Sequence, residues 1–329
     1  MVAGPRSDSN ESTALVGAEG DVVGLHVVVG KGPVGTGTAE VLVRAGHRVR
    51  VLSRSGGTST DVEHRAVDAA DAGALAAAAE GADVLYNAVN PAYHRWATDW
   101  PPVATALLGA AERTGAVLVA MGNLYGYGRP AGPMTAATPL AARDVKGQVR
   151  VRMWADMLAA HEAGRVRVTE ARASDFIGPS VPPAQSHLIR QLGTLQAGRR
   201  ARVVGDPDAP HSWAYLPDVA AVLATLGTDE RAWGRAWMVP STPPRSQRQA
   251  LTDLAAAIGA PPAKVSGIPW PVLTAGGVVV PQLREITAIR HQFDAAFVVD
   301  GSETTATFGV EATSWDEVCR ATAVGLRRT

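Results

Sequence analysis

The 329-residue chain has little that would cross-link it or give it an overall charge. Its single cysteine, Cys319, allows no internal disulfide bond and cannot by itself build a thiolate metal site. Lys and Arg together number 31, and so do Asp and Glu, so the formal net charge is zero. A neutral chain has no bulk positive field to attract nucleic acid or anionic lipid. We therefore expect a protein of a reducing compartment, the cytoplasm, with no nucleic-acid partner and no membrane partner.

Long apolar runs are missing as well. No segment reaches the roughly 20 apolar residues that a membrane-spanning helix needs. Residues 1–22 are small, polar and turn-rich, and they lack the apolar stretch of a signal peptide, so we expect a disordered tail there. The chain has 46% hydrophobic and 19% charged residues, which is typical of a water-soluble globular protein.

Three common catalytic signatures are also absent. The eight histidines show neither an H-x-x-x-H nor an HExxH arrangement, so we expect no metal site. No GxSxG segment marks the nucleophile of an α/β-hydrolase. No GxxxxGK[ST] segment marks the phosphate loop of a nucleoside triphosphatase. These absences exclude the three most recognisable hydrolytic sites.

Hydrophobic periodicity alternates between strand-like and helix-like stretches over the first half of the chain. Short β-branched or alternating runs predict strands at residues 25–29, 47–53, 63–68, 82–90, 116–122 and 165–172. Helical spacing predicts helices between them, at residues 34–45, 71–80, 103–114 and 147–163. Strands and helices that alternate at these lengths are typical of βαβ units, which form a parallel sheet with helices on both faces.

After residue 175 the pattern breaks into shorter pieces. Pro-rich connectors such as "GPSVPPAQS" and "PSTPPRS" separate them, and residues 313–326 form the last predicted helix. We therefore predict an α/β fold, a Rossmann-type doubly wound parallel sheet with a smaller C-terminal substrate-binding region. The predicted domains are a dinucleotide-binding domain at residues 23–175 and a substrate-binding region, interleaved with the sheet, at residues 176–329.

The segment "VVVGKGPVGTG" places a glycine cluster between the first strand and the first helix. One glycine would allow a tight turn, the second would leave room for a phosphate, and the third would let the helix pack closely on the strand. The helix N-terminus adds a partial positive charge. The pyrophosphate of a dinucleotide would then be held by Gly30, Lys31, Gly32, Pro33, Val34 and Gly35. The alternative is a glycine-rich turn without a ligand.

The end of the second predicted strand indicates which dinucleotide binds. An acid there would bond the ribose 2′-hydroxyl of NAD, but the strand ends in Leu52-Ser53-Arg54. Ser53 and Arg54 can receive a 2′-phosphate instead, and Lys31 adds a second cation. We therefore expect NADP rather than NAD. The alternative is that Arg54 is an ordinary solvated loop residue.

Further segments carry a resemblance to a known family. After the glycine loop come "VDAADAGALAAAAEGADVLYNAVNP", "ARASDFIGP" and "VVGDPDAPHSWAYLPDVAAVLATL". Together these segments resemble the extended or atypical short-chain dehydrogenases/reductases of the NAD-dependent epimerase/dehydratase family, over most of residues 24–325. The resemblance implies that Asp68 meets the adenine, and that Asn87, Ala88 and Val89 lie under the cofactor ribose. It also implies a homodimer and places "ARASDFIGP" near the nicotinamide.

The chain departs from this family where the chemistry is expected. The family uses a Ser or Thr after the fifth strand, then a Tyr and a Lys four residues apart on the next helix, and the tyrosinate exchanges a proton with the substrate. Here Met121-Gly122-Asn123 follows the fifth strand, and the next helical segment carries Lys146 and Arg150 but no tyrosine. The chain's tyrosines, none with Lys at the fourth following position, are Tyr86, Tyr93, Tyr125, Tyr127 and Tyr215.

Three interpretations of the chemistry remain open. In the first, Tyr125 or Tyr127 supplies the phenol, Asn123 orients it, and Lys146 or Arg150 is the neighbouring cation. Of the two tyrosines, we expect Tyr125 to pack in the core and Tyr127 to be the exposed phenol. In the second interpretation the protein binds the cofactor but carries out non-redox chemistry. In the third it senses redox state without turnover.

Two further sites are candidates by position alone. His211 would act as an acid or base if it faces the substrate cleft, and is otherwise a hydrogen-bonded strand end. His94 and Trp96 follow the fourth strand, in a loop that either lines a pocket or lies on the surface. The sequence thus predicts an NAD(P)-dependent oxidoreductase or epimerase-like enzyme for a small carbonyl, hydroxyl or sugar-derived substrate. The alternative is a related protein that binds NAD(P) as a non-redox enzyme or a redox-sensing regulator.

Overall fold

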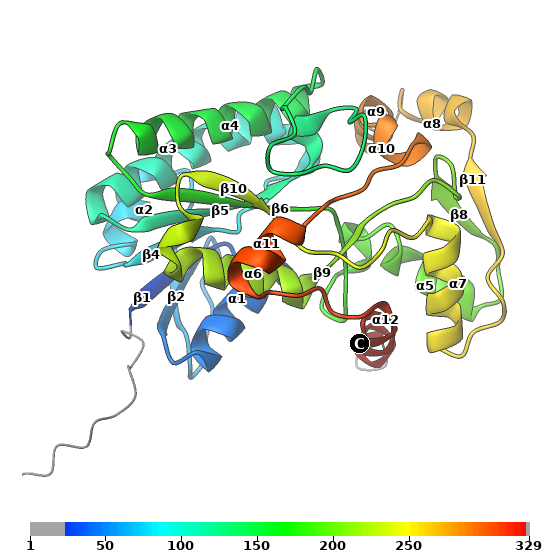
Figure 1. The fold of residues 1–329 in the computed structure, drawn as a ribbon, viewed down its shortest axis with the longest axis horizontal. Helices are drawn as coiled ribbons and strands as arrows, with labels where there is room; N and C mark the ends of the chain where they lie inside the picture. Colours follow the sequence, from blue (N-terminus) through cyan, green and yellow to red (C-terminus); the bar gives the residue numbers. More distant parts are fainter. Residues whose placement is uncertain (1–23, 280, 327–329) are drawn as a thin grey trace, which may run out of the picture.

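The computed structural model describes residues 24–279 and 281–326. The tail predicted at residues 1–22 lies outside the described residues. A central sheet flanked by helices makes up one side of the molecule, and a group of shorter elements lies at one end of it (Figure 1).

Seven strands in the described part of the chain form one sheet, and all neighbouring pairs are parallel. Their order across the sheet is β10-β6-β5-β4-β1-β2-β3. The strands are β1 (Leu25–Val29), β2 (Arg48–Ser53), β3 (Glu63–Ala66), β4 (Val84–Asn87), β5 (Val117–Asn123), β6 (Val168–Ala173) and β10 (Arg235–Met238). The chain runs outward from β1 to β3 and then returns to β4 on the other side of β1. Ligands of open α/β sheets bind outside the carboxyl ends of the strands at such a reversal.

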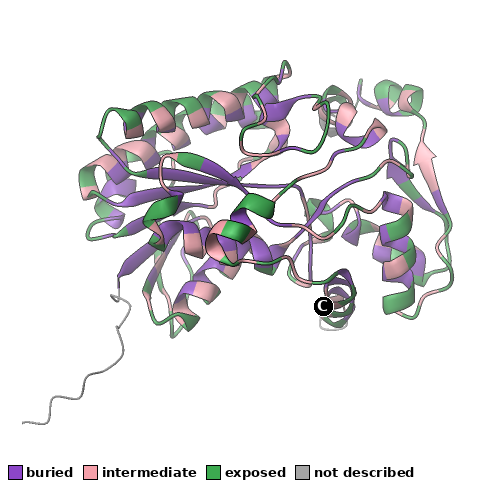
Figure 2. Cartoon of the chain, viewed as in Figure 1, coloured by how far each residue is buried: buried purple, intermediate pink, exposed green. Residues whose placement is uncertain are grey.

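Helices cover both faces of this sheet (Figure 1). The helices on the two faces are α1 (Pro33–Arg44), α2 (Ala72–Ala78), α3 (Trp96–Thr114), α4 (Val145–Glu162) and α6 (Leu216–Thr228). One apolar core joins the sheet to α2, α3 and α4, and a second core joins it to α1 and α6. Because both faces are covered, the central strands are buried along their whole length, as β1 is (Figure 2). The predicted doubly wound parallel sheet is therefore confirmed.

Helix α3 begins seven residues before the predicted start at residue 103. The predicted start left Pro101 and Pro102 outside the helix, and proline removes a backbone hydrogen bond from a helix interior. The structure includes both in the helix. Trp96 and Trp100 from its first turns are 3% and 0% exposed, and the Arg150 guanidinium lies over both rings. Burial of two indoles outweighs the hydrogen bonds that the prolines remove.

Two elements from the second half of the chain complete the sheet domain. Strand β10 pairs with β6, with Arg235 opposite Thr169, and α6 packs against α1. The chain therefore returns to the sheet after residue 175. The sequence patterns did not predict β10, because it is only four residues long and lies between loops, whereas the segment that forms α6 was among those that carried the family resemblance.

The remaining elements form the smaller C-terminal region. They build two parallel strand pairs, β8 with β11 and β7 with β9, and a third apolar core. They are β7 (Asp175–Ile177), β8 (Ala201–Val204), β9 (Trp213–Tyr215), β11 (Val265–Ile268), α5 (Leu192–Gln196), α7 (Gln247–Ala257), α8 (Trp270–Gly276), α9 (Pro281–Ala288), α10 (His291–Asp294), α11 (Ser302–Phe308) and α12 (Trp315–Leu326). The helix predicted at residues 313–326 is thus observed as α12. Among the helices of the described chain, none is both long and apolar enough to pass through a lipid bilayer.

A buried histidine near the start of β1 makes the stability of this fold depend on pH. His26 is 2% exposed, its Nδ1 lies 3.0 Å from the Tyr86 hydroxyl oxygen, and its ring stands 4.1 Å from the His47 ring. Burial, helped by His47, lowers the pKa of His26 from 6.5 to about 4. The folded protein therefore holds this imidazole neutral.

We expect mild acid to destabilise the protein through His26. The pKa of His26 is lower in the folded protein than in the unfolded chain. The stabilisation that depends on a neutral His26 is therefore complete above pH 6.5 and is lost as the pH falls toward 4. The full loss is about 3 kcal/mol in the free energy of unfolding. Urea unfolding at about pH 8 and about pH 4 should show a smaller loss for His26→Gln than for the wild type. An identical loss in both proteins would contradict this assignment.

Candidate cofactor and active site

The glycine loop after β1 contains three glycines with different surroundings. A side chain at Gly30 or Gly35 would clash with the backbone, whereas a side chain at Gly32 would enter open space. Gly30 has a φ of 110°, and a Cβ there would lie 2.5 Å from the Ala88 carbonyl oxygen. A Cβ on Gly35 would overlap the Gly30 carbonyl oxygen, so α1 lies directly on the loop. Gly32 differs, because no atom of the described residues lies within 4 Å of its would-be Cβ. Two glycines serve close packing, and Gly32 leaves free space.

The free space at Gly32 lies at the N-terminus of α1. Gly32 is the N-cap of this 12-residue helix and has no side chain with which to cap it, and Pro33 is the first helical residue. The backbone N–H groups and the positive end of the helix dipole therefore face the same open space. A pyrophosphate needs these donors, this potential and the missing Cβ. The residues present fit the pyrophosphate of a dinucleotide, with Val34 and Gly35 in the first turn.

Polar side chains gather on the β2 side of the loop. Ser53 ends β2, and its Oγ donates a hydrogen bond of 3.1 Å to the Gly56 carbonyl oxygen. Lys31 Nζ donates to the same oxygen at 2.8 Å. Arg54 follows as an exposed residue, and the exposed Asp68 lies beyond the end of β3. The structure thus brings the side chains of Lys31 and Ser53 together at the Gly56 carbonyl oxygen, with Arg54 in the same loop as Gly56.

The loop after β4 lies on the other side of the glycines. Asn87 is buried at the end of β4, opposite Val29 of β1, and its Oδ1 accepts the Val89 N–H at 3.1 Å. This bond turns the chain so that the Ala88 carbonyl faces Gly30. Residues 87–89 therefore lie next to the glycine loop, at the reversal of the sheet.

Titratable side chains follow three neighbouring strands at the same edge. Tyr93 follows β4, Tyr125 follows β5, and Asp175 comes two residues after β6. The hydroxyl oxygens of Tyr93 and Tyr125 lie 3.4 Å apart, and the charge of Asp175 acts on both. If an adenosine lay over β2 and β3, a dinucleotide across the reversal would point its nicotinamide toward these three residues.

Tyr125 is half-buried between aromatic rings. Its ring centroid lies 5.7 Å from that of Trp96 and 6.3 Å from that of Tyr93, and its backbone N–H donates to Asn123 Oδ1 at 3.1 Å. Burial, together with the charge of Asp175, raises the pKa of Tyr125 far above its usual value, and burial does the same for Tyr93. Both phenols therefore stay protonated at neutral pH.

Tyr127 does not present an exposed phenol, so our expectation for it is wrong. It is 1% exposed and packs among Leu124, Met134, Met238 and Phe297. Its hydroxyl accepts a 2.7 Å hydrogen bond from Arg172 and lies 3.4 Å from Met238 Sδ. The glycines around it suggested an open loop. Apolar residues from the second half of the chain instead cover the ring.

Lys146 lies at the start of α4 and contacts Tyr93 at this edge of the sheet. It is 3% exposed, and its Nζ lies 2.7 Å from both the Tyr93 carbonyl oxygen and Glu285 Oε2 of α9. The same ammonium stands 4.1 Å from the centroid of the Tyr93 ring. Arg150, one turn later, donates to the Met121 carbonyl oxygen at 3.3 Å. Lys146 is thus a neighbour of Tyr93, and its charge is balanced by a glutamate that the sequence analysis did not identify.

His211 pairs with Asp175, which the sequence analysis also did not single out. His211 Nε2 lies 2.9 Å from Asp175 Oδ2 and 3.5 Å from Ser174 Oγ. Burial opposes ionisation of Asp175, but the His211 hydrogen bond and the charge of His187 lower its pKa to about 2. One signal in the sequence marked Asp175: it is an acid placed directly beyond a buried strand.

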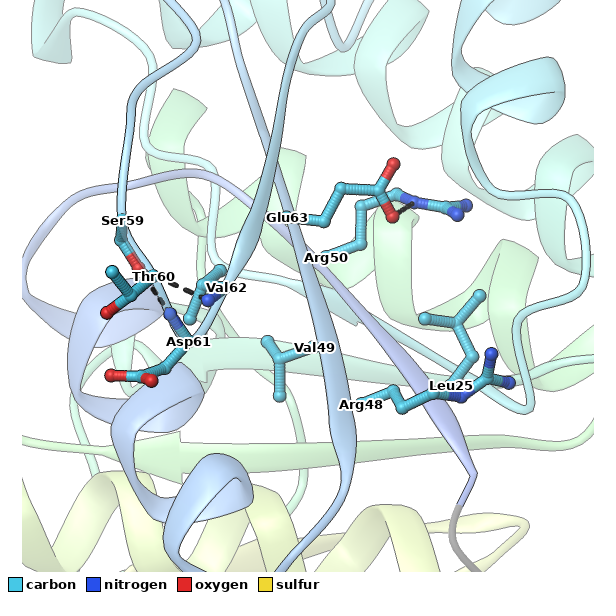
Figure 3. Close-up of a pocket in the computed structure, with 9 residues that line it drawn as sticks. All are labelled: Leu25, Arg48, Val49, Arg50, Ser59, Thr60, Asp61, Val62 and Glu63. Carbon is cyan, nitrogen blue, oxygen red and sulfur yellow. Dashed lines mark hydrogen bonds and ion pairs between the residues drawn. The ribbon is translucent and has the colours of Figure 1, made fainter.

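A separate hollow lies at the opposite edge of the sheet (Figure 3). Leu25, Arg48 and Glu63, which begin β1, β2 and β3, line it, and Arg50 pairs there with Glu63 at 2.7 Å. It is therefore far from the carboxyl ends where a dinucleotide would lie. Within the described chain, no three His, Cys, Asp or Glu side chains gather as they would to hold a metal ion.

Solved structures share this architecture. The dTDP-glucose 4,6-dehydratase of Bacillus anthracis, in complex with NAD, has a TM-score of 0.76 at 13% identity, covering 93% of this chain and 97% of that one. UDP-glucose 4-epimerase of Thermotoga maritima, with UDP-glucose, has a TM-score of 0.76 at 14% identity, covering 92% and 99%. The Bordetella bronchiseptica enzyme WbmG, with NAD and UDP, has a TM-score of 0.71 at 18% identity, covering 92% and 94%. At these identities the likeness shows the fold.

The family assignment comes from the sequence. No curated protein matches the chain in a sequence search. The model of the NAD dependent epimerase/dehydratase family matches residues 26–237, which include the glycine loop, strands β1–β6 except the first residue of β1, and most of β10. This range is well over half of the chain, and it confirms the resemblance stated from the motifs. The chain therefore belongs to the NAD dependent epimerase/dehydratase family.

Proposed function

We propose that the protein is an NAD(P)-dependent oxidoreductase or epimerase-like enzyme that acts on a small hydroxyl or carbonyl compound, sugar-derived compounds included. One observation carries the proposal. The open space at Gly32 and the side chains of Tyr93, Tyr125 and Asp175 follow β1, β4, β5 and β6 at one edge of the sheet. A dinucleotide bound at the first would extend to the others. The NAD complexes named among the similar structures support the same cofactor class.

The chemistry divides between the cofactor and the chain. The nicotinamide, when bound, would supply hydride transfer to and from the substrate carbon. The protonated hydroxyls of Tyr93 and Tyr125 would donate hydrogen bonds to the substrate oxygen. The Asn123 side chain would hold Tyr125 in place by accepting a hydrogen bond from the Tyr125 backbone N–H. Lys146 would fix the Tyr93 loop through its carbonyl. Half-burial of these groups limits the water around the reacting atoms.

We further propose NADP as the preferred dinucleotide. Lys31 and Arg54 supply two cations, and Ser53 a hydroxyl, next to the end of β2, and no acid stands at that position. A 2′-phosphate carries charge that these cations would neutralise, whereas the 2′-hydroxyl of NAD would leave them unused.

Arg54→Ala should weaken NADP⁺ binding about 10-fold and leave NAD⁺ binding within about 2-fold. The loss follows from removing one charge-assisted contact at an exposed site. Calorimetric titration of both dinucleotides measures it. Arg48→Ala is the matched control, because Arg48 is an exposed arginine at the opposite end of the same strand. Equal NADP⁺ affinities for Arg54→Ala and the wild type would contradict the preference.

The proposed activity is tested by mixing the NADP⁺-loaded or NAD⁺-loaded protein with UDP-glucose, dTDP-glucose and small secondary alcohols. The appearance of the reduced-nicotinamide absorbance band with any of them supports an oxidoreductase. Inversion of a sugar carbon without net reduction, seen by proton NMR, supports an epimerase-like reaction.

A redox-sensing regulator is the second candidate. It is favoured by the burial of Tyr127 and by the Lys146–Glu285 pair, which leave no tyrosine beside a free lysine among the described residues. Tight dinucleotide binding without reduction, exchange or inversion of any probe would support this candidate over the enzyme.

A further inference from the structure

Among the ionisable groups on the proposed nicotinamide side, Asp175 differs in how its side chain is paired. Lys146 is paired with Glu285, and the hydroxyls of Tyr93 and Tyr125 lie against each other. Asp175 is held on one carboxylate oxygen, Oδ2, and its side chain keeps 22% of its surface exposed. It is therefore the ionised group of this set that retains an open side.

His211 holds this carboxylate in a fixed position. The His211 ring lies 4.4 Å from the Trp213 ring and 5.4 Å from the Phe297 ring, and it is 3% exposed. An isolated bridge between His211 and Phe297 also fixes its backbone. A ring packed in this way cannot turn away from Asp175, so the Nε2–Oδ2 contact of 2.9 Å is structurally imposed. The Asp175 carboxylate is therefore held in one orientation by His211.

Because the phenols of Tyr93 and Tyr125 stay protonated, another group must accept the proton that the substrate hydroxyl loses. Tyr93 and Tyr125 can donate hydrogen bonds but do not ionise near neutral pH, because burial opposes their charged forms. The groups that face Asp175 are Tyr93, Tyr125, His187, Arg190 and His211. Asp175 is the carboxylate of this group, and its hydrogen bond with His211 holds it in place.

We propose that the Asp175–His211 pair is the proton acceptor of the reaction, with Asp175 as the catalytic residue and His211 as its positioning residue. The inference rests on the proposed oxidoreductase function. When a secondary alcohol is oxidised, its C–H hydrogen leaves with two electrons to the nicotinamide of NAD(P)⁺. The O–H proton passes to the open Asp175 oxygen, and the C–O bond becomes a carbonyl. Reduction of the carbonyl reverses each transfer.

The test is single-turnover hydride transfer by the full-length, dinucleotide-loaded protein, with whichever of UDP-glucose, dTDP-glucose or the secondary alcohols the wild type oxidises. Asp175→Asn should lower this rate about 100-fold and leave dinucleotide affinity unchanged. Asp175→Glu should recover part of the rate, because it restores the carboxylate. Asp61→Asn is the control, since Asp61 is an exposed acid at the opposite edge of the sheet and should react like the wild type.

The positioning role of His211 is tested by two ring replacements. His211→Phe keeps the stacking but removes the hydrogen bond that lowers the pKa of Asp175, so the acid limb of the pH–rate profile should move to higher pH. His211→Gln offers an amide donor and should move the limb less. Normal hydride transfer by Asp175→Asn, or an unmoved acid limb in His211→Phe, overturns the pair while the oxidoreductase stands. Failure of the wild type with every probe, despite bound dinucleotide, overturns both.

Discussion

Gly32→Asp is expected to abolish dinucleotide binding without unfolding the protein. Nothing in the described chain lies within 4 Å of the Cβ position, and the backbone there is extended, with φ −71° and ψ 179°, so the side chain fits. The new carboxylate would occupy the place of the pyrophosphate. Two like charges about 4 Å apart near a protein surface repel by about 4 kcal/mol. We therefore expect affinity for NADP⁺ and NAD⁺ to fall at least about 100-fold in calorimetric titration.

The same substitution should leave the thermal midpoint unchanged or slightly higher, because Asp is a better helix N-cap than Gly by a few tenths of a kcal/mol. This combination separates a lost ligand site from a damaged fold. Gly37→Ala, within α1, is the matched control: its Cβ would meet Ala220 Cβ at an ordinary 3.5 Å, so binding should stay as in the wild type. If Gly32→Asp still bound either dinucleotide normally, the cofactor would not lie on this glycine loop.

Arg172→Met should destabilise the fold by about 3–5 kcal/mol. The side chains of Arg172 and Glu170 are 4% and 7% exposed, and Arg172 Nε donates to Glu170 Oε2 at 2.6 Å. The guanidinium also donates to the Tyr127 hydroxyl. Methionine keeps much of the volume but leaves a buried carboxylate without its partner, and that uncompensated charge is costly. Urea unfolding at neutral pH measures the loss.

A double variant separates the charge from the packing. Glu170→Gln combined with Arg172→Met removes the orphaned charge, so it should regain most of the lost stability. If the double variant were no more stable than Arg172→Met alone, the loss would come from packing against Trp154 and Tyr127 instead. Neither variant should change dinucleotide affinity, because β6 carries this pair in the interior of the sheet domain.

Much of the sheet domain could be predicted from the sequence because its signals are local. A buried parallel strand appears in the sequence as a run of apolar residues, and a helix that covers the sheet appears as apolar residues at helical spacing. The observed β1, β2 and α1 therefore begin and end within one or two residues of their predicted bounds. The glycine loop is local in the same way. The turn at Gly30, the free space at Gly32 and the packing at Gly35 lie within six residues of chain.

The side-chain pairs of the candidate site could not be predicted, because each joins residues far apart in the chain. Asp175 meets His211 across 36 residues, and Lys146 meets Glu285 across a much longer stretch. Periodicity reports that a face is covered, but it does not say by which distant segment. The burial of Tyr127 shows this most directly, since the residues that cover it include Met238 and Phe297 from the second half.

The sequence by itself therefore determined the α/β class, the strand–helix alternation, the glycine loop and the family, since each depends on residue spacing within a short stretch. Only the tertiary structure decided which phenol is buried, what balances Lys146 and which acid stands beside a histidine. Those outcomes depend on how the C-terminal region packs onto the carboxyl edge of the sheet. That packing is the sum of many weak long-range contacts, and no short segment of the chain encodes it.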